Sequence, residues 1–136
     1  MKYQFSFLVL CLFVVYGCRE EVEPIPDVVH QIELDKSFSL VPPEKARYNE
    51  LNMQILGITD DRCPPGEACK QEGGEAVVIL SVQTDGKSEQ LTLTLNNPDV
   101  DGLHTVVLGD YRYTLERVTH TKIPFNFEVG LLVSKP

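Results

Sequence analysis

Basic residues are scarce in this 136-residue chain, which has 12 Lys and Arg against 20 Asp and Glu. The formal net charge of −8 becomes −9 once Lys2 leaves with the signal peptide predicted below, and every acidic residue lies beyond Cys18. Nucleic acids and anionic lipid headgroups are held by clustered Lys and Arg side chains. The composition therefore argues against nucleic acid as a partner and against electrostatic binding to anionic lipids.

The motifs of common catalytic classes are also missing. No serine lies in G-x-S-x-G, there is no C-x-x-C redox pair, and no Gly-rich phosphate loop is present. The histidines, His30, His104 and His120, lie on separate segments and form neither H-x-H nor H-E-x-x-H. We expect a protein that is not an enzyme and has no cofactor. The alternative is a hydrolase whose catalytic carboxylates meet only in the fold.

No segment has the pattern of an amphipathic helix. Apolar residues recur with a period of two almost everywhere, which is typical of β-strands. Residues 75–83 are apolar on both faces, so we expect them to form a central strand. Only residues 44–49 are predicted as a helical turn.

Turn signals divide the chain into about eight short strands. Asp85-Gly86 and Gly109-Asp110 predict tight hairpins, Pro42-Pro43 ends a strand, and Gly57 at a shift in the alternation indicates a β-bulge. The predicted strands are 28–34, 38–41, 51–58, 75–83, 90–95, 103–108, 111–118 and 125–133. The pattern favours an all-β fold, a single antiparallel β-sandwich or a small barrel.

The N-terminus predicts export. A basic start is followed by an apolar run from Phe5 to Tyr16, which is too short to span a membrane and is typical of a signal peptide. Val15-Tyr16-Gly17-Cys18 resembles the lipobox of bacterial lipoproteins, in which cleavage precedes a lipidated cysteine. The resemblance implies that Cys18 carries the lipid. Each CH₂ group of an acyl chain that is buried in the bilayer contributes about 0.8 kcal/mol to the free energy of membrane binding, so two or three acyl chains would anchor the protein stably.

We therefore expect three parts. Residues 1–17 form the lipoprotein signal peptide, 18–26 an acidic, Pro-punctuated flexible tether, and 27–136 the β-domain. Residue 19 is Arg and not the Asp that holds lipoproteins of enteric bacteria at the inner membrane, and the acidic residues after it resemble surface-export signals. These features predict an outer-membrane protein, held by its N-terminal lipid at the periplasmic face or the cell surface.

Two thiols remain in the exported domain, because Cys11 leaves with the signal peptide and Cys18 carries the lipid. An oxidising compartment favours a disulfide between Cys63 and Cys69, which stabilises by about 2 kcal/mol for so short a loop. The alternatives are a redox pair and a metal site. Zinc takes four ligands, however, and no further Cys or His pair lies nearby in the sequence.

The cysteine segment resembles a motif of small exported bacterial lipoproteins of uncharacterised function. The shared pattern is D-x-R-C-P, a second Cys and then G-x-A-x-V, here residues 60–64, Cys69 and residues 74–78. Relatives place a Trp after the second Cys, where this chain has Lys70-Gln71-Glu72. The resemblance spans most of residues 38–136 and implies a β-fold but no activity.

The loop 60–74 is the predicted binding surface, because loops on a β-scaffold commonly carry binding residues. Its candidate binding residues are Asp60, Asp61, Arg62, Glu67, Lys70, Gln71 and Glu72. We expect Arg62 to be exposed. Paired carboxylates at positions 60 and 61 could hold a cation, but solvated side chains are the simpler expectation.

A second polar segment resembles the start of a calcium loop. Asn97, Asp99 and Asp101 supply oxygen ligands at alternate positions, and Gly102 follows. The bidentate Glu that should follow is replaced by Leu108. We therefore expect a polar β-turn and no metal.

Together these features predict a lipid-anchored, non-enzymatic binding protein of the cell envelope. Its partner would be an envelope protein or an extracellular ligand. A structural or assembly role through an exposed strand edge is the main alternative, and a hydrolase is the third.

Overall fold

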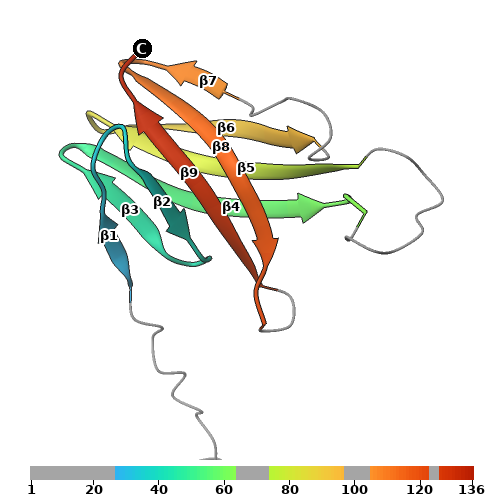
Figure 1. The fold of residues 1–136 in the computed structure, drawn as a ribbon. Coiled ribbons are helices and arrows are strands. Elements are labelled where there is room, and N and C mark those ends of the chain that lie inside the picture. The colour runs from blue at the N-terminus through green and yellow to red at the C-terminus, as the bar shows by residue number, and fades with distance from the viewer. Residues whose placement is uncertain (1–26, 64–73, 97–104, 123–125) are drawn as a thin grey trace, which may run out of the picture.

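The computed structural model describes residues 27–63, 74–96, 105–122 and 126–136, and all regular structure in these ranges is β (Figure 1). Nine strands form two sheets that pack face to face without closing into a barrel. The strands are β1 (Val29–Gln31), β2 (Ser37–Leu40), β3 (Lys45–Tyr48), β4 (Leu51–Asp60), β5 (Glu75–Thr84), β6 (Lys87–Asn96), β7 (Thr105–Leu108), β8 (Tyr111–His120) and β9 (Phe127–Ser134). The predicted all-β sandwich is confirmed, with one strand more than expected.

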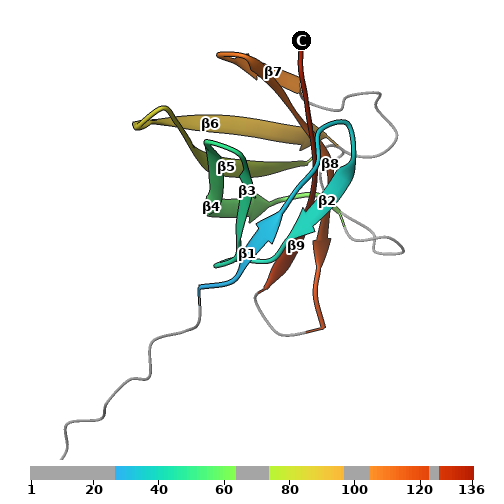
Figure 2. The same cartoon turned by 90° about the vertical axis from the view of Figure 1, so that its left-hand side faces the viewer.

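The two sheets differ in size and in one pairing. The five-stranded sheet has the order β1-β3-β4-β5-β6, and the four-stranded sheet has the order β2-β9-β8-β7. Figure 2 shows β4, β5 and β6 on one side and β2, β8 and β9 on the other. The chain crosses to the four-stranded sheet for β2 between β1 and β3. The pair β1–β3 is parallel, whereas the other pairs are antiparallel.

The core lies between the sheets and follows the period-two alternation. The buried apolar side chains are Ile32, Leu40, Ala46, Leu51, Met53, Ile55, Ala76, Val78, Leu80, Val82, Leu91, Leu93, Tyr113, Leu115, Val118, Val129, Leu131 and Val133. β5 lies between β4 and β6 as expected for a central strand, but Ile79 on its outer face is 37% exposed. Apolar burial of this kind contributes roughly 25 cal/mol per Å² and is the main force that holds the sheets together.

The predicted bulge is confirmed. The register between β4 and β5 shifts between Ile55 and Gly57, so that Ile55 and Ile58 both turn toward the core. A second shift, between Leu115 and Arg117 in β8, was not predicted. Gly130 lies opposite it, where a Cβ atom would come within 3.1 Å of the Arg117 Cβ atom.

The helical turn predicted for residues 44–49 is wrong. Lys45–Tyr48 is strand β3, in which Ala46 is buried opposite Met53 while Arg47 is exposed. Asn49, with φ of 49°, allows the two-residue turn that returns the chain as β4. Tertiary pairing on both edges of β3 overrides a local pattern that is only six residues long.

Two other predicted boundaries change. The first strand shortens from 28–34 to Val29–Gln31, and Val28 is 44% exposed. The chain turns at Asp35, where φ is 60°. β2 ends at Leu40, just before Pro42-Pro43, as predicted.

Three two-residue hairpin turns gather at one end of the sandwich, at the left and top left of Figure 1. They are Asn49-Glu50, Asp85-Gly86 and Gly109-Asp110, and each contains a residue with positive φ. The last two were predicted from sequence. β1 runs parallel to β3, which ends at Asn49-Glu50, so the domain begins at the end of the strands away from these turns.

Candidate functional site

Arg62, predicted as an exposed binding residue, is instead a link between the two sheets. Its Nε and Nη2 atoms donate to the two carboxylate oxygens of Asp60, both at 2.8 Å. Nη2 also donates to the Val118 carbonyl oxygen in β8, at 2.6 Å. The side chains of Arg62 and Asp60 are only 16% and 4% exposed. The predictions that Arg62 is exposed and that Asp60 is solvated are therefore wrong. The two side chains form an ion pair that is buried where the two sheets meet.

The electrostatics of Asp60 follow from this contact. Burial works to raise the pKa of the Asp60 carboxyl, but the hydrogen bonds and the charge of Arg62 outweigh it and hold the pKa below its ordinary value. The Nε2 atom of His120 lies 3.7 Å from Asp60 Oδ2, and its ring packs on Phe127 at 4.6 Å between centroids. The described start of the predicted loop is thus a charged, hydrogen-bonded anchor.

Gly74 closes the other side of this anchor. A Cβ atom at Gly74 would lie 2.1 Å from the Asp61 carbonyl oxygen, and Asp61 N donates to the Glu75 carbonyl oxygen at 3.0 Å. Only glycine allows the two backbone segments to approach so closely. The glycine of the sequence motif therefore has a packing role.

Apart from Asp61 and Cys63, the other predicted site residues lie outside the described residues. They are Cys18, Glu67, Cys69, Lys70, Gln71, Glu72, Asn97, Asp99 and Asp101. Lipidation of Cys18, the Cys63–Cys69 disulfide, ligand binding by the loop and the polar turn at 97–102 accordingly stay predictions. Asp61, at the described edge of the loop, is exposed as expected.

A cavity of about 330 Å³ lies where the three hairpin turns meet, and we call it the end cleft. Its walls are the Asn49-Glu50, Asp85-Gly86 and Gly109-Asp110 turns, the end of β5 and the start of β8. Tyr111 and Tyr113, at the start of the strand predicted for residues 111–118, line it. The three turns form a rigid frame, because each is closed by an antiparallel ladder.

Three tyrosines form one cluster beside the end cleft. The ring of Tyr48 meets that of Tyr111 edge to face, at 6.5 Å and 82°, and Tyr111 lies 6.5 Å from Tyr113 at 59°. Tyr113 is 1% exposed, and its hydroxyl has no hydrogen-bond partner among the described residues. Burial, then Tyr111 and Glu89, raise the pKa of Tyr113 to about 12. A buried hydroxyl without a partner is uncommon and calls for a ligand or water.

Four carboxylates surround the end cleft, and we call them the acidic rim. They are Glu50, Asp85, Glu89 and Asp110. Glu89 pairs with the core residue Val82, so it projects from the inner face of β6 beyond the packed core. None of the four forms an ion pair with another described residue. The rim therefore presents carboxylates that have no ion-pair partner among the described residues.

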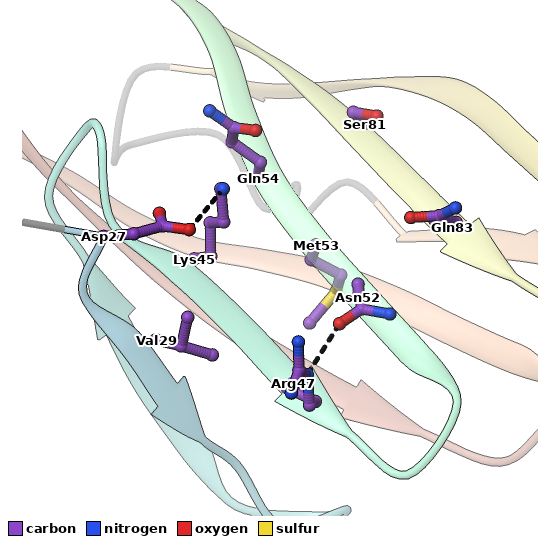
Figure 3. A pocket seen from close by; sticks show the side chains of 9 residues that line it. All are labelled: Asp27, Val29, Lys45, Arg47, Asn52, Met53, Gln54, Ser81 and Gln83. Carbon is purple, nitrogen blue, oxygen red and sulfur yellow. Dashed lines mark hydrogen bonds and ion pairs between the residues drawn. The ribbon is translucent and has the colours of Figure 1, made fainter.

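A second hollow, of about 270 Å³, lies on the outer face of β3, β4 and β5 (Figure 3). It is polar, with side chains such as Gln54 and Gln83 along its floor. Its cationic side chains already have partners: Lys45 Nζ lies 2.8 Å from Asp27 Oδ2, and Arg47 Nε donates to Asn52 Oδ1 at 2.8 Å. The end cleft, with its unpartnered hydroxyl and carboxylates, is the stronger candidate.

Comparison with known proteins finds no matching family model, no matching curated protein and no matching solved structure. The likeness of the cysteine segment to exported lipoproteins therefore stays a prediction. The described residues include no helix that is long and apolar enough to cross a membrane. Within the same ranges, no group of three or more His, Cys, Asp and Glu is placed to hold a metal ion.

Proposed function

We propose that this chain is an exported, lipid-anchored binding protein of the cell envelope, which takes its ligand at the end cleft and catalyses no reaction. The observation that carries the proposal is the Tyr113 hydroxyl, which is buried beside an open cavity and has no hydrogen-bond partner among the described residues. Ligand sites are concave, rich in aromatic side chains and supplied with a few directed polar groups. The end cleft has each of these properties.

The orientation of the domain fits such a role. The predicted tether joins the domain at β1, which starts at the end of the strands away from the end cleft. A lipid on Cys18 in the outer membrane would thus leave the cleft facing away from the bilayer. The proposed disulfide between Cys63 and Cys69 would brace the loop next to the Arg62 anchor.

The longest edge strand gives the structural alternative no support. β6 is a ten-residue edge strand, and its outward residues are all polar: Ser88, Gln90, Thr92, Thr94 and Asn96. An edge built for assembly would be expected to present apolar side chains beside its free backbone groups. For the hydrolase alternative, the buried carboxylate of Asp60 is paired with Arg62 and not with a second carboxylate.

The intact mass of the protein from its native membranes, measured with and without reductant, tests the first half of the proposal. We expect a chain that begins at acylated Cys18 and has no free thiol until it is reduced. A mass without lipid would contradict the anchor, and two free thiols would contradict the disulfide.

A fragment screen by protein-observed NMR on the isotopically labelled protein tests the second half. Fragments should shift the resonances of Tyr48, Tyr111 and Tyr113 and of the three hairpin turns. Shifts confined to the outer-face hollow of Figure 3 would overturn the end cleft as the binding site.

A further inference from the structure

We infer that the end cleft binds an organic cation, an ammonium or guanidinium group held between the tyrosine cluster and the acidic rim. This inference rests on the proposed function and names the chemical class of its ligand. Three independent features of the described residues point to it: the charge of the rim, the arrangement of the rings and the buried hydroxyl.

The charge around the cleft is negative and unpaired. Each hairpin turn contributes one carboxylate, and Glu89 adds a fourth from the inner face of β6. The nearest cations in the sequence are not paired with them. Lys87 is exposed and forms no ion pair with a described residue, and Arg112 pairs across the ladder with the exposed residue Val107 on the outer face. In a chain of formal charge −8, this end attracts cations over a Debye length of about 10 Å.

The rings are arranged in a corner. Tyr111 and Tyr113, which both line the cleft, are tilted by 59° to each other, and Tyr48 supports Tyr111 from outside the lining in an edge-to-face contact at 82°. Aromatic faces attract ammonium and guanidinium groups through the ring quadrupole, and several rings at an angle form the cages that hold alkylammonium ligands.

The Tyr113 hydroxyl supplies the directional contact. It is buried, stays neutral until far above neutral pH and has no described partner, so its oxygen can accept a hydrogen bond from an N–H donor. Glu89 lines the same cavity as Tyr113, which places one rim carboxylate beside the proposed cation. The carboxylates are spread over three turns and β6, which suits an extended organic cation better than a bare metal ion.

The protein carries its own reporter for the test. It has no tryptophan and five tyrosines, of which Tyr3 and Tyr16 lie in the predicted signal peptide. The other three form the cluster at the end cleft. In the processed protein, all tyrosine fluorescence therefore comes from this cluster, in which Tyr111 and Tyr113 line the proposed site and Tyr48 packs on Tyr111. If the signal peptide is retained, the same titration is made on the full chain with Tyr3 and Tyr16 replaced by Phe.

The probes are Nα-acetyl-lysine methylamide, its neutral Nε-acetylated analogue and the anionic Nα-acetyl-glutamate methylamide. We expect a saturable fluorescence change with the cationic probe only, which weakens as ionic strength rises. Tyr113→Phe and Glu89→Gln should each weaken binding about five- to tenfold, the loss expected for one hydrogen bond or one charge contact. Calorimetry on the same samples gives the affinities.

Glu75→Gln is the matched control, because Glu75 is an exposed carboxylate at the opposite end of β5 and should leave affinity unchanged. Equal binding of the neutral probe would overturn the cation assignment and leave the end cleft as a binding site. Undiminished binding in Tyr113→Phe and Glu89→Gln would place the cation elsewhere. No response to any probe would overturn the inference that the ligand is a cation. The proposed binding function itself would be contradicted only if no fragment bound in the NMR screen as well.

Discussion

Arg62 shows how one side chain can hold the two sheets together. It gives two hydrogen bonds to Asp60 in its own sheet and one to the Val118 carbonyl oxygen in the other. The sequence showed that this segment is charged, but it did not show that Arg62 contacts Val118, which lies 56 residues further along the chain. An interaction of that sequence separation is set by how the sheets pack, and no local pattern encodes it.

Replacing Arg62 by Met should destabilise the fold by about 3 kcal/mol, the lower end of the range for removing one partner of a buried pair. The loss arises because Asp60 would stay enclosed without its counter-charge. Urea unfolding followed by circular dichroism measures it.

Arg117→Met provides the control for this change. Its ion pair with Glu128, at 2.9 Å, lies on the outer face, where the Arg117 side chain is 56% exposed. Exposed pairs contribute about 0–1 kcal/mol, so this variant should lose less than 1 kcal/mol. Equal losses in the two variants would contradict the role assigned to Arg62.

Among the elements, β3 shows where a sequence pattern is too short to decide. Four residues, Lys45–Tyr48, fit one helical turn or two strand repeats equally well. Long strands such as β5, with ten residues, were recognised because alternation over that length excludes a helix. What fixes β3 is its pairing on both edges, with β1 and with β4.

The turn after β3 gives the prediction at this scale. Asn49 adopts φ of 49°, which glycine tolerates freely and a β-branched residue does not. Asn49→Val should destabilise the domain by about 1–2 kcal/mol, whereas Asn49→Gly should change its stability little. Thermal unfolding of the two variants measures the difference. Equal stabilities would show that the hairpin does not depend on this backbone conformation.

The end cleft belongs to the scale of the whole molecule, which is why the sequence did not predict it. The strand predicted for residues 111–118 is present, and its alternation places Tyr111 and Tyr113 on the inner face of β8. Whether an inner residue is covered or lies at an open end depends on where the second sheet stops, and that is fixed by the packing of both sheets. Acidic residues in the three hairpin turns were visible in the sequence, but their convergence was not.

Tyr113 also makes the stability of the whole fold depend on pH in the alkaline range. Its pKa is raised to about 12 in the folded protein, against about 10 in an unfolded chain. The stabilisation from the neutral Tyr113 hydroxyl is therefore complete below about pH 10 and is lost as the pH rises toward about 12. The reason is that the hydroxyl loses its proton at a lower pH in the unfolded chain than in the folded protein. Ionisation would place a charge between the two sheets.

The free energy of unfolding should fall by about 2–3 kcal/mol across this range, in proportion to the pKa shift. Tyr113→Phe should lack the part of this decline that comes from Tyr113. The difference in the free energy of unfolding between the two proteins therefore separates the effect of Tyr113 from that of the lysines, which titrate in the same pH range. Urea unfolding at a series of pH values measures both. A parallel decline in the two proteins would contradict the assignment.

The parallel pairing of β1 with β3 has a mechanical consequence. If a lipid holds the N-terminus and a ligand pulls at the opposite end, the force runs along the axis of β1. The register pairs Val29–Lys45, His30–Ala46 and Gln31–Arg47 are then loaded together in shear, and not opened one after another. Under tension, the five-stranded sheet would act as the load path between ligand and membrane.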